Sequence, residues 1–142
     1  MNNSIVPIDG TLEDKKIKLE QIKLILGECK AKTKIAIIDG LVSEENNNSN
    51  YEKELTGSDV TFLIASKEGQ LVPESNGFRQ SVFGHFLIRG LKGEADADKD
   101  KKITLVELFT YANENVKSHT GSTQTPAMYG KYPTNMPIGI LR

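Results

Sequence analysis

The segment from Val82 to Val116 constrains the fold of this chain more than any other part of it. Its beginning and its end both carry apolar residues at steps of three and four, which is the spacing of one buried helix face. These residues are Val82, Phe83, Phe86, Leu87 and Leu91 at the beginning, and Leu105, Leu108, Ala112 and Val116 at the end. An acid-rich turn with alternating aspartates separates the two groups. The pattern predicts two amphipathic helices, at about residues 78–92 and 105–118, that flank an acidic loop.

The acidic loop has two interpretations. In the first, its oxygen-bearing residues follow the spacing of an EF-hand calcium loop. Asp96, Asp98, Asp100, Thr104 and Glu107 fall on positions one, three, five, nine and twelve, and Lys102 falls on position seven, which ligates through its backbone carbonyl. Position six is Lys101 instead of the glycine that the sharp turn requires, and two ammonium groups beside a dication oppose binding. No cofactor other than calcium is expected from this sequence.

In the second interpretation the same residues form a metal-free turn. Thr104 would cap the helix that follows, and Glu107, three residues later, would complete a capping box. Because both interpretations use Thr104 and Glu107, the sequence leaves them open.

Two apolar runs upstream predict neighbouring strands of one sheet. The run from Ile35 to Asp39 is continuous, as in a buried parallel strand, and ends in a carboxylate; a second run covers 59–66. Shorter strands are predicted at about 4–8, 102–105 and 137–141, and a first helix at about 13–29. Residues 44–57 are rich in Asn and predict a mobile loop, whereas 119–142 predict an irregular segment. The whole chain, 1–142, is expected to form a single α/β domain.

Several short motifs occur together in the order of a known family. They are Ala65-Ser66, Glu74, Val82-Phe83, Gly90-Leu91, Gly93 to Asp96, Glu107-Leu108 and Gln124 to Pro126. Together they resemble the C-terminal half of the caspase-like cysteine peptidases, above all the bacterial caspase and metacaspase relatives. The resemblance implies a caspase-like three-layer α/β/α sandwich that is incomplete, because the half with the catalytic histidine is absent from this sequence.

The resemblance also locates the nucleophile position. In the family, the strand that matches Ile35 to Asp39 runs into the catalytic cysteine, but here Leu41 occupies that place and cannot attack a carbonyl carbon. Ser43 matches a family serine, and Asp39 matches an aspartate that helps to bind a basic substrate side chain in metacaspases. Asp39 and Ser43 are therefore the substrate-binding candidates that the resemblance implies, and no catalytic residue is assigned. The alternative for Asp39 is a carboxylate that caps local backbone amides at a strand end.

Composition narrows the classes of partner. Lys and Arg number 18 against 19 Asp and Glu, so no net field favours nucleic acid or an anionic membrane. The single cysteine, Cys29, excludes an internal disulfide and favours a cytoplasmic location. Without the first half of the sheet, the Ile35 to Ile38 strand would keep unpaired backbone groups. We therefore expect a protein partner: a second copy, giving a homo-oligomer, or a complementary half-domain.

Three functional hypotheses follow. The favoured one is a caspase-like domain that is inactive alone and acts by protein association. In the second, the chain is part of a working cysteine endopeptidase whose His-bearing half lies elsewhere or whose cysteine was mutated. In the third, it is a calcium-responsive binding module that uses the loop 96–107.

Overall fold

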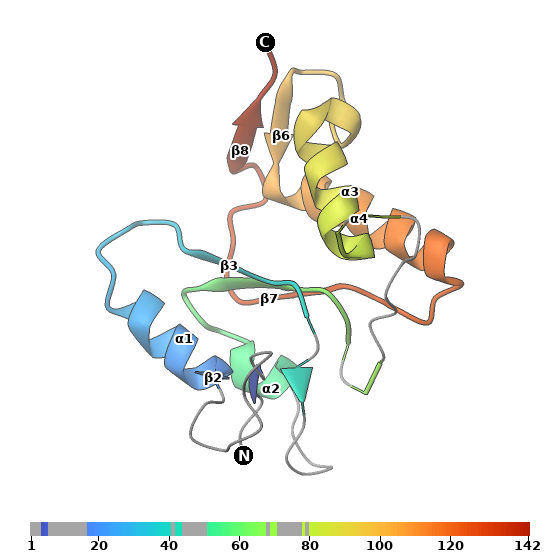
Figure 1. The fold of residues 1–142 in the computed structure, drawn as a ribbon. Helices are drawn as coiled ribbons and strands as arrows, with labels where there is room; N and C mark the ends of the chain where they lie inside the picture. Colours follow the sequence, from blue (N-terminus) through green and yellow to red (C-terminus); the bar gives the residue numbers. More distant parts are fainter. Residues whose placement is uncertain are drawn as a thin grey trace.

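The computed structural model describes residues 4–5, 17–40, 42–43, 51–67, 69–70, 78 and 80–142, which form a mixed α/β fold (Figure 1). Its elements in chain order are β1 (Ser4–Ile5), β2 (Ile17–Lys18), α1 (Leu19–Gly27), β3 (Ile35–Ile38), β4 (Val42–Ser43), α2 (Tyr51–Leu55), β5 (Thr61–Ile64), α3 (Val82–Arg89), a π-helical turn η2 (Gly90–Glu94), β6 (Lys102–Thr104), α4 (Leu105–Thr120), β7 (Ala127–Tyr129) and β8 (Pro137–Ile140). The α/β class predicted from the sequence is confirmed.

The sheet that organises the core has the order β3-β5-β7. β3 and β5 are parallel, with Ala36 opposite Phe62, and β7 is antiparallel to β5. All four residues of β5 are buried, as the apolar run predicted. Successive side chains of a strand point to opposite faces, so β5 contributes to two cores.

Helices lie on both faces of this sheet. Leu63 packs with the apolar faces of α3 and α4 in one core, and Phe62 and Ile64 pack with α1 and α2 in the other. Figure 1 shows α1 and α2 below the sheet, and α3 and α4 above it. Because α3 and α4 frame the acidic loop, their packing on β5 fixes the position of that loop relative to the sheet.

Both helices that flank the acidic loop begin at side-chain caps. The Ser81 hydroxyl accepts a hydrogen bond from the Gly84 amide at 2.8 Å, and Thr104 and Glu107 form the capping box expected of the metal-free turn. α4 ends at Gly121, whose left-handed backbone (φ 59°) closes the last turn. The two predicted helices are confirmed, with the first divided into α3 and η2.

The acidic loop is attached to the end of the chain. β6, which lies inside the loop, pairs antiparallel with β8, and Ile103 opposite Gly139 is fully buried. The Leu141 amide extends this contact by donating to the Lys101 carbonyl at 2.8 Å. The strands predicted at 102–105 and 137–141 therefore pair with each other.

Three expectations need correction. The segment 44–57 is not entirely a loop, since its described part contains α2, which is anchored by the fully buried Leu55. The segment 119–142 is not irregular, because α4 continues to Thr120 and two strands follow it. β7 forms by pairing with the edge of β5, and β8 forms by pairing with β6. The helix predicted over 13–29 begins only at Leu19, because Ile17–Lys18 pairs with β1.

β3 also differs from its prediction. The uninterrupted apolar run predicted burial on both faces, but 52% of the Ile37 surface is exposed. Within the described residues β3 pairs only with β5, so it forms an edge of its sheet. Ile37 lies on that edge, beyond the cover of α3 and α4.

Candidate functional site

The carboxyl end of β3 carries an aspartate that is held against helix α3. Asp39 is exposed, and its Oδ2 accepts a hydrogen bond from the Ser81 hydroxyl at 2.6 Å. Gly84 lies directly beside this pair, since a Cβ there would come within 2.9 Å of both Asp39 Oδ2 and Ser81 Oγ. Asp39 thus binds a side chain 42 residues away, whereas the sequence had suggested neighbouring amides as its structural partner. Ser81 is the residue of this site that the sequence analysis missed, although a serine before an apolar helix is a recognised capping signal.

The other positions near this strand end are described only in part. Ser43 belongs to β4, where it is opposite Ser4 of β1, and its side chain is outside the description. Leu41 and Glu74 lie outside the described residues. Of the two substrate-binding candidates, Asp39 is therefore the one whose side chain can be placed.

The carboxyl end of β5 is fastened to the segment between α4 and β7. Gln124 is fully buried, and its Nε2 donates to the Ala65 carbonyl at 2.9 Å. At the next residue, the Thr125 carbonyl accepts a hydrogen bond from the Lys67 amide, and the Thr125 amide donates to Gln70 Oε1, both at 2.8 Å. Two motifs that are far apart in the sequence are therefore in direct contact.

The acidic loop brings three carboxylates together. One oxygen each from Asp96, Asp98 and Glu107 lies within 4.8 Å of the others. Asp100 is not part of this group, and its Oδ2 lies 3.9 Å from the ammonium of Lys102. The predicted ligand positions one, three and twelve thus converge, whereas position five turns toward a lysine.

The backbone of the loop adopts the turn that glycine would normally make. Lys99 and Lys101 have φ angles of 62° and 66°. These values lie in the left-handed region, which residues other than Gly and Asn seldom adopt. Aspartate side chains hold this shape, since the amides of Lys101 and Lys102 donate to Asp96 Oδ2 and Asp100 Oδ1. The lysine at position six therefore does not prevent the sharp turn.

The electrostatics of the loop centre on Glu107 and Asp96. Hydrogen bonds from the backbone and hydroxyl of Thr104, followed by backbone amides of the loop, hold the pKa of the Glu107 carboxyl below its usual range. Asp96 Oδ1 is buried without a hydrogen-bond partner in the structure. A buried acceptor without a donor is unfavourable. A cation or a water at this oxygen would relieve that penalty, and the carboxylates beside it favour a cation.

A second charged network lies where η2 meets α4. Arg89 Nε donates to Glu94 Oε1 at 2.7 Å, and the Tyr111 hydroxyl donates to Glu94 Oε2. These two hydrogen bonds hold the pKa of Glu94 below its usual range. Burial, then the bond to Glu94, raises the pKa of Tyr111 from 10.0 to about 12.

Tyr111 should give the native state a specific alkaline pH dependence. Its pKa is raised on folding, so its stabilising contribution is complete below pH 10 and is lost as the pH rises toward about 12. We expect Tyr111→Phe to flatten the fall of the melting temperature in this pH window. Melting curves recorded by circular dichroism across the window measure it, with Tyr132→Phe as the control. Equal slopes in the wild type and Tyr111→Phe would contradict the assignment.

The two histidines of the chain pack against aromatic rings. The ring of His85 stacks on Phe78 with centroids 3.9 Å apart, and the centroid of the His119 ring lies 5.0 Å from that of Phe78. Cys29 is exposed just after the end of α1. These contacts place both imidazoles in an aromatic group next to Phe86, where they contribute to packing.

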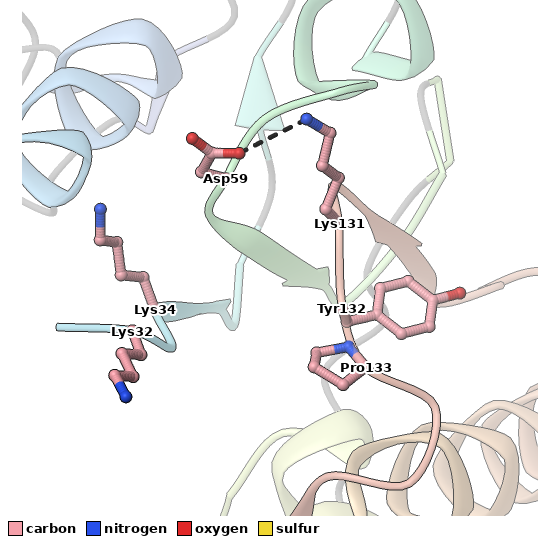
Figure 2. A pocket seen from close by; sticks show the side chains of 6 residues that line it. All are labelled: Lys32, Lys34, Asp59, Lys131, Tyr132 and Pro133. Atoms are coloured by element: carbon pink, nitrogen blue, oxygen red, sulfur yellow. Dashed lines mark ion pairs between the residues drawn. The ribbon is translucent and has the colours of Figure 1, made fainter.

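One open pocket lies where the chain enters β3 and β5. It measures about 410 Å³ and is lined by Lys32, Lys34, Asp59, Lys131, Tyr132 and Pro133. Figure 2 shows that the three ammonium groups point in different directions. The ammonium group of Lys34 donates to the Gly27 carbonyl at 2.9 Å, and the Lys131 Nζ lies 3.5 Å from Asp59 Oδ1. The lysines therefore do not converge on a single anion.

Comparisons of this chain with protein-family models, with curated proteins and with solved structures find no match. In the described part of the chain, none of the helices has the length and apolarity that a membrane crossing requires.

Proposed function

We propose that the chain is a caspase-like domain that has no peptidase activity alone and acts by associating with another protein chain. The arrangement of the sheet supports this proposal: a parallel pair, β3 and β5, an antiparallel third strand and helices on both faces. Contacts between the motifs of the resemblance support it further. Gln124 binds the Ala65 carbonyl, and Gly90 is packed so tightly that a Cβ there would lie 2.7 Å from Leu108 Cδ1.

The chemistry of the site argues against catalysis by this chain alone. A cysteine peptidase needs a thiolate and a base to activate it, and Leu41 stands at the nucleophile position. Both histidines are engaged with Phe78. Leu41→Cys should therefore remain inactive toward basic and acidic peptide substrates, and clear turnover by this variant would contradict the proposal.

The proposed association with another chain uses the open edge of β3. Thr61 and Ala65 donate their amides to the carbonyls of Lys34 and Ile38, each at 2.9 Å, so these carbonyls point toward β5. Backbone groups alternate in direction along a strand, and those of Ile35 and Ile37 therefore point to the open side. Exposed strand edges of this kind pair readily with other chains.

Amide hydrogen exchange of the dilute protein tests this proposal. The Ile35 and Ile37 amides should exchange rapidly, whereas the Ala36 and Ile38 amides, which face β5, should be protected. Strong protection of all four amides at low concentration would mean that the chain already covers its own edge, and the proposed association would then lose its basis.

Calcium binding is a second candidate function, favoured by the convergence of Asp96, Asp98 and Glu107 and by the buried Oδ1 of Asp96, which has no hydrogen-bond donor. Calcium that binds only the native state stabilises it by mass action, by about 2.7 kcal/mol when the free ion is at one hundred times its dissociation constant. We expect a higher melting temperature in calcium than in chelator. Asp96→Asn should abolish this difference, while Asp59→Asn, outside the loop, should retain it.

A sodium chloride control distinguishes specific calcium binding from general screening of the charges. The same ionic strength supplied as sodium chloride should leave the melting temperature close to that in chelator. If calcium and chelator give the same melting temperature in the wild type, the loop is the metal-free capped turn.

A further inference from the structure

The edge of β3 has the features of a surface that pairs with itself. It contains only apolar residues, with no charged residue that would oppose pairing, and its outward backbone groups come from Ile35 and Ile37. Ile37 is also the most exposed side chain of the strand. In the described residues no other element pairs with this side of β3.

One flank of α1 is also apolar and exposed. Lys23 of α1 donates to the Glu54 carbonyl of α2, so that flank of the helix faces α2 and the covered side of the sheet. Ile25 follows Lys23 by two residues, which is about 200° around a helix. It therefore lies on the flank away from α2, and it is 71% exposed. Ile25 and Ile37 thus leave apolar surface uncovered on opposite faces of the sheet, because α1 packs with Ile38 whereas Ile37 points to the other face.

We infer that β3 pairs antiparallel with β3 of a second copy of this chain, with Ile37 opposite Ile37 on the two-fold axis. This inference rests on the proposed association and names its partner and register. A two-fold axis perpendicular to the sheet makes such a contact self-complementary. In this register the Ile37 N–H of each copy donates to the Ile37 C=O of the other copy. The two exposed isoleucine side chains cover each other.

The charges at the ends of β3 fit the same arrangement. Lys32 and Lys34 precede the strand, and Asp39 follows it. Antiparallel pairing brings the basic end of one copy beside the acidic end of the other, twice in the symmetric dimer. A parallel pairing would place the like charges together, so the charge pattern favours the antiparallel one.

The contact is small, because it consists of a four-residue strand from each copy. Interfaces of this size are weak, so we expect a reversible dimer with a dissociation constant in the micromolar range. Dimer formation should also slow exchange of the Ile35 and Ile37 amides as the protein concentration is raised.

Sedimentation velocity over a concentration series tests the inference. Ile37→Lys places a charge at the two-fold axis and should weaken the dimer at least tenfold. Ile88→Lys makes the same substitution at an exposed isoleucine of α3, which is 43% exposed, and should leave the dimer unchanged. In a Cys29→Ser background, Ile37→Cys should be cross-linked between copies by a short bismaleimide, whereas Ile88→Cys should not.

The outcomes separate the inference from the proposal on which it rests. Loss of the dimer in Ile37→Lys only, with cross-linking at position 37, supports the inference. A wild-type protein that stays monomeric, or a dimer that is equally sensitive to both lysine variants, overturns it. In either case rapid exchange of the Ile35 and Ile37 amides would still support association with a different chain. Slow exchange of these amides in the monomer would contradict both the dimer and the proposed association.

Discussion

Gly130→Ala should lower the free energy of unfolding by about 3–5 kcal/mol, the largest effect that we expect from a single methyl group in this protein. Gly130 directly follows β7 and has a φ of 95°, a conformation that strains any residue with a side chain. A Cβ at this position would lie 2.1 Å from the Val60 carbonyl oxygen. That oxygen belongs to the backbone that leads into β5, so it cannot move aside without disturbing the central strand.

Chemical denaturation measures this loss, and Gly121→Ala is the matched control. Gly121 also has a positive φ, of 59°, but nothing lies within 4 Å of a Cβ there. It should therefore show only the backbone strain, about 1–2 kcal/mol. Equal losses at the two positions would mean that the close approach to Val60 contributes nothing.

Gln124→Ala should produce the second large loss, about 2–5 kcal/mol, because it empties a fully buried site and removes the hydrogen bond to the Ala65 carbonyl. Gln124→Met separates these two contributions, since it keeps most of the volume and loses only the polar contact. It should cost about 1 kcal/mol, because the lost bond is offset in part by removal of Oε1, which is buried without a partner.

Both variants are compared with the wild type by urea denaturation. If Gln124→Met loses as much stability as Gln124→Ala, the hydrogen bond dominates and the cavity is unimportant. If Gln124→Ala is as stable as the wild type, the segment after α4 is not a structural part of the core.

The helices around the acidic loop could be predicted because their signals are local. The apolar spacing of Val82 to Leu91 and of Leu105 to Val116 identifies the buried faces, and Thr104 with Glu107 marks the start of α4 within four residues. The fully buried strand β5 was equally clear. In each case the residues that specify the element lie within it.

The remaining features depend on residues that are distant in the sequence. β7 forms because its backbone completes the edge of β5, and α2 forms because Leu55 fills a core made by other elements. Nothing within either segment signals those partners. The contact between Asp39 and Ser81 likewise depends on α3 packing beside β3, so the aspartate could be identified as a candidate but its partner could not.

The exposure of Ile37 illustrates the same limit. Its sequence context resembles that of a strand covered on both faces, and only the position of β3 at the edge of the sheet distinguishes the two cases. The convergence of Asp96, Asp98 and Glu107 was predicted by spacing, whereas the turn of Asp100 toward Lys102 depends on side-chain geometry.

The order in which the strands pair has a consequence for biosynthesis. β5 gains its second neighbour only from residues 127–129, and the acidic loop is pinned only by residues 137–140. A nascent chain leaves the ribosome from its N-terminus, so both ladders stay incomplete until the C-terminal segment emerges. Until residues 127–140 have emerged, the edge of β5 stays unpaired on that side, and the growing chain should bind chaperones that hold unfolded segments. Release should follow once residues 137–140 have left the ribosome.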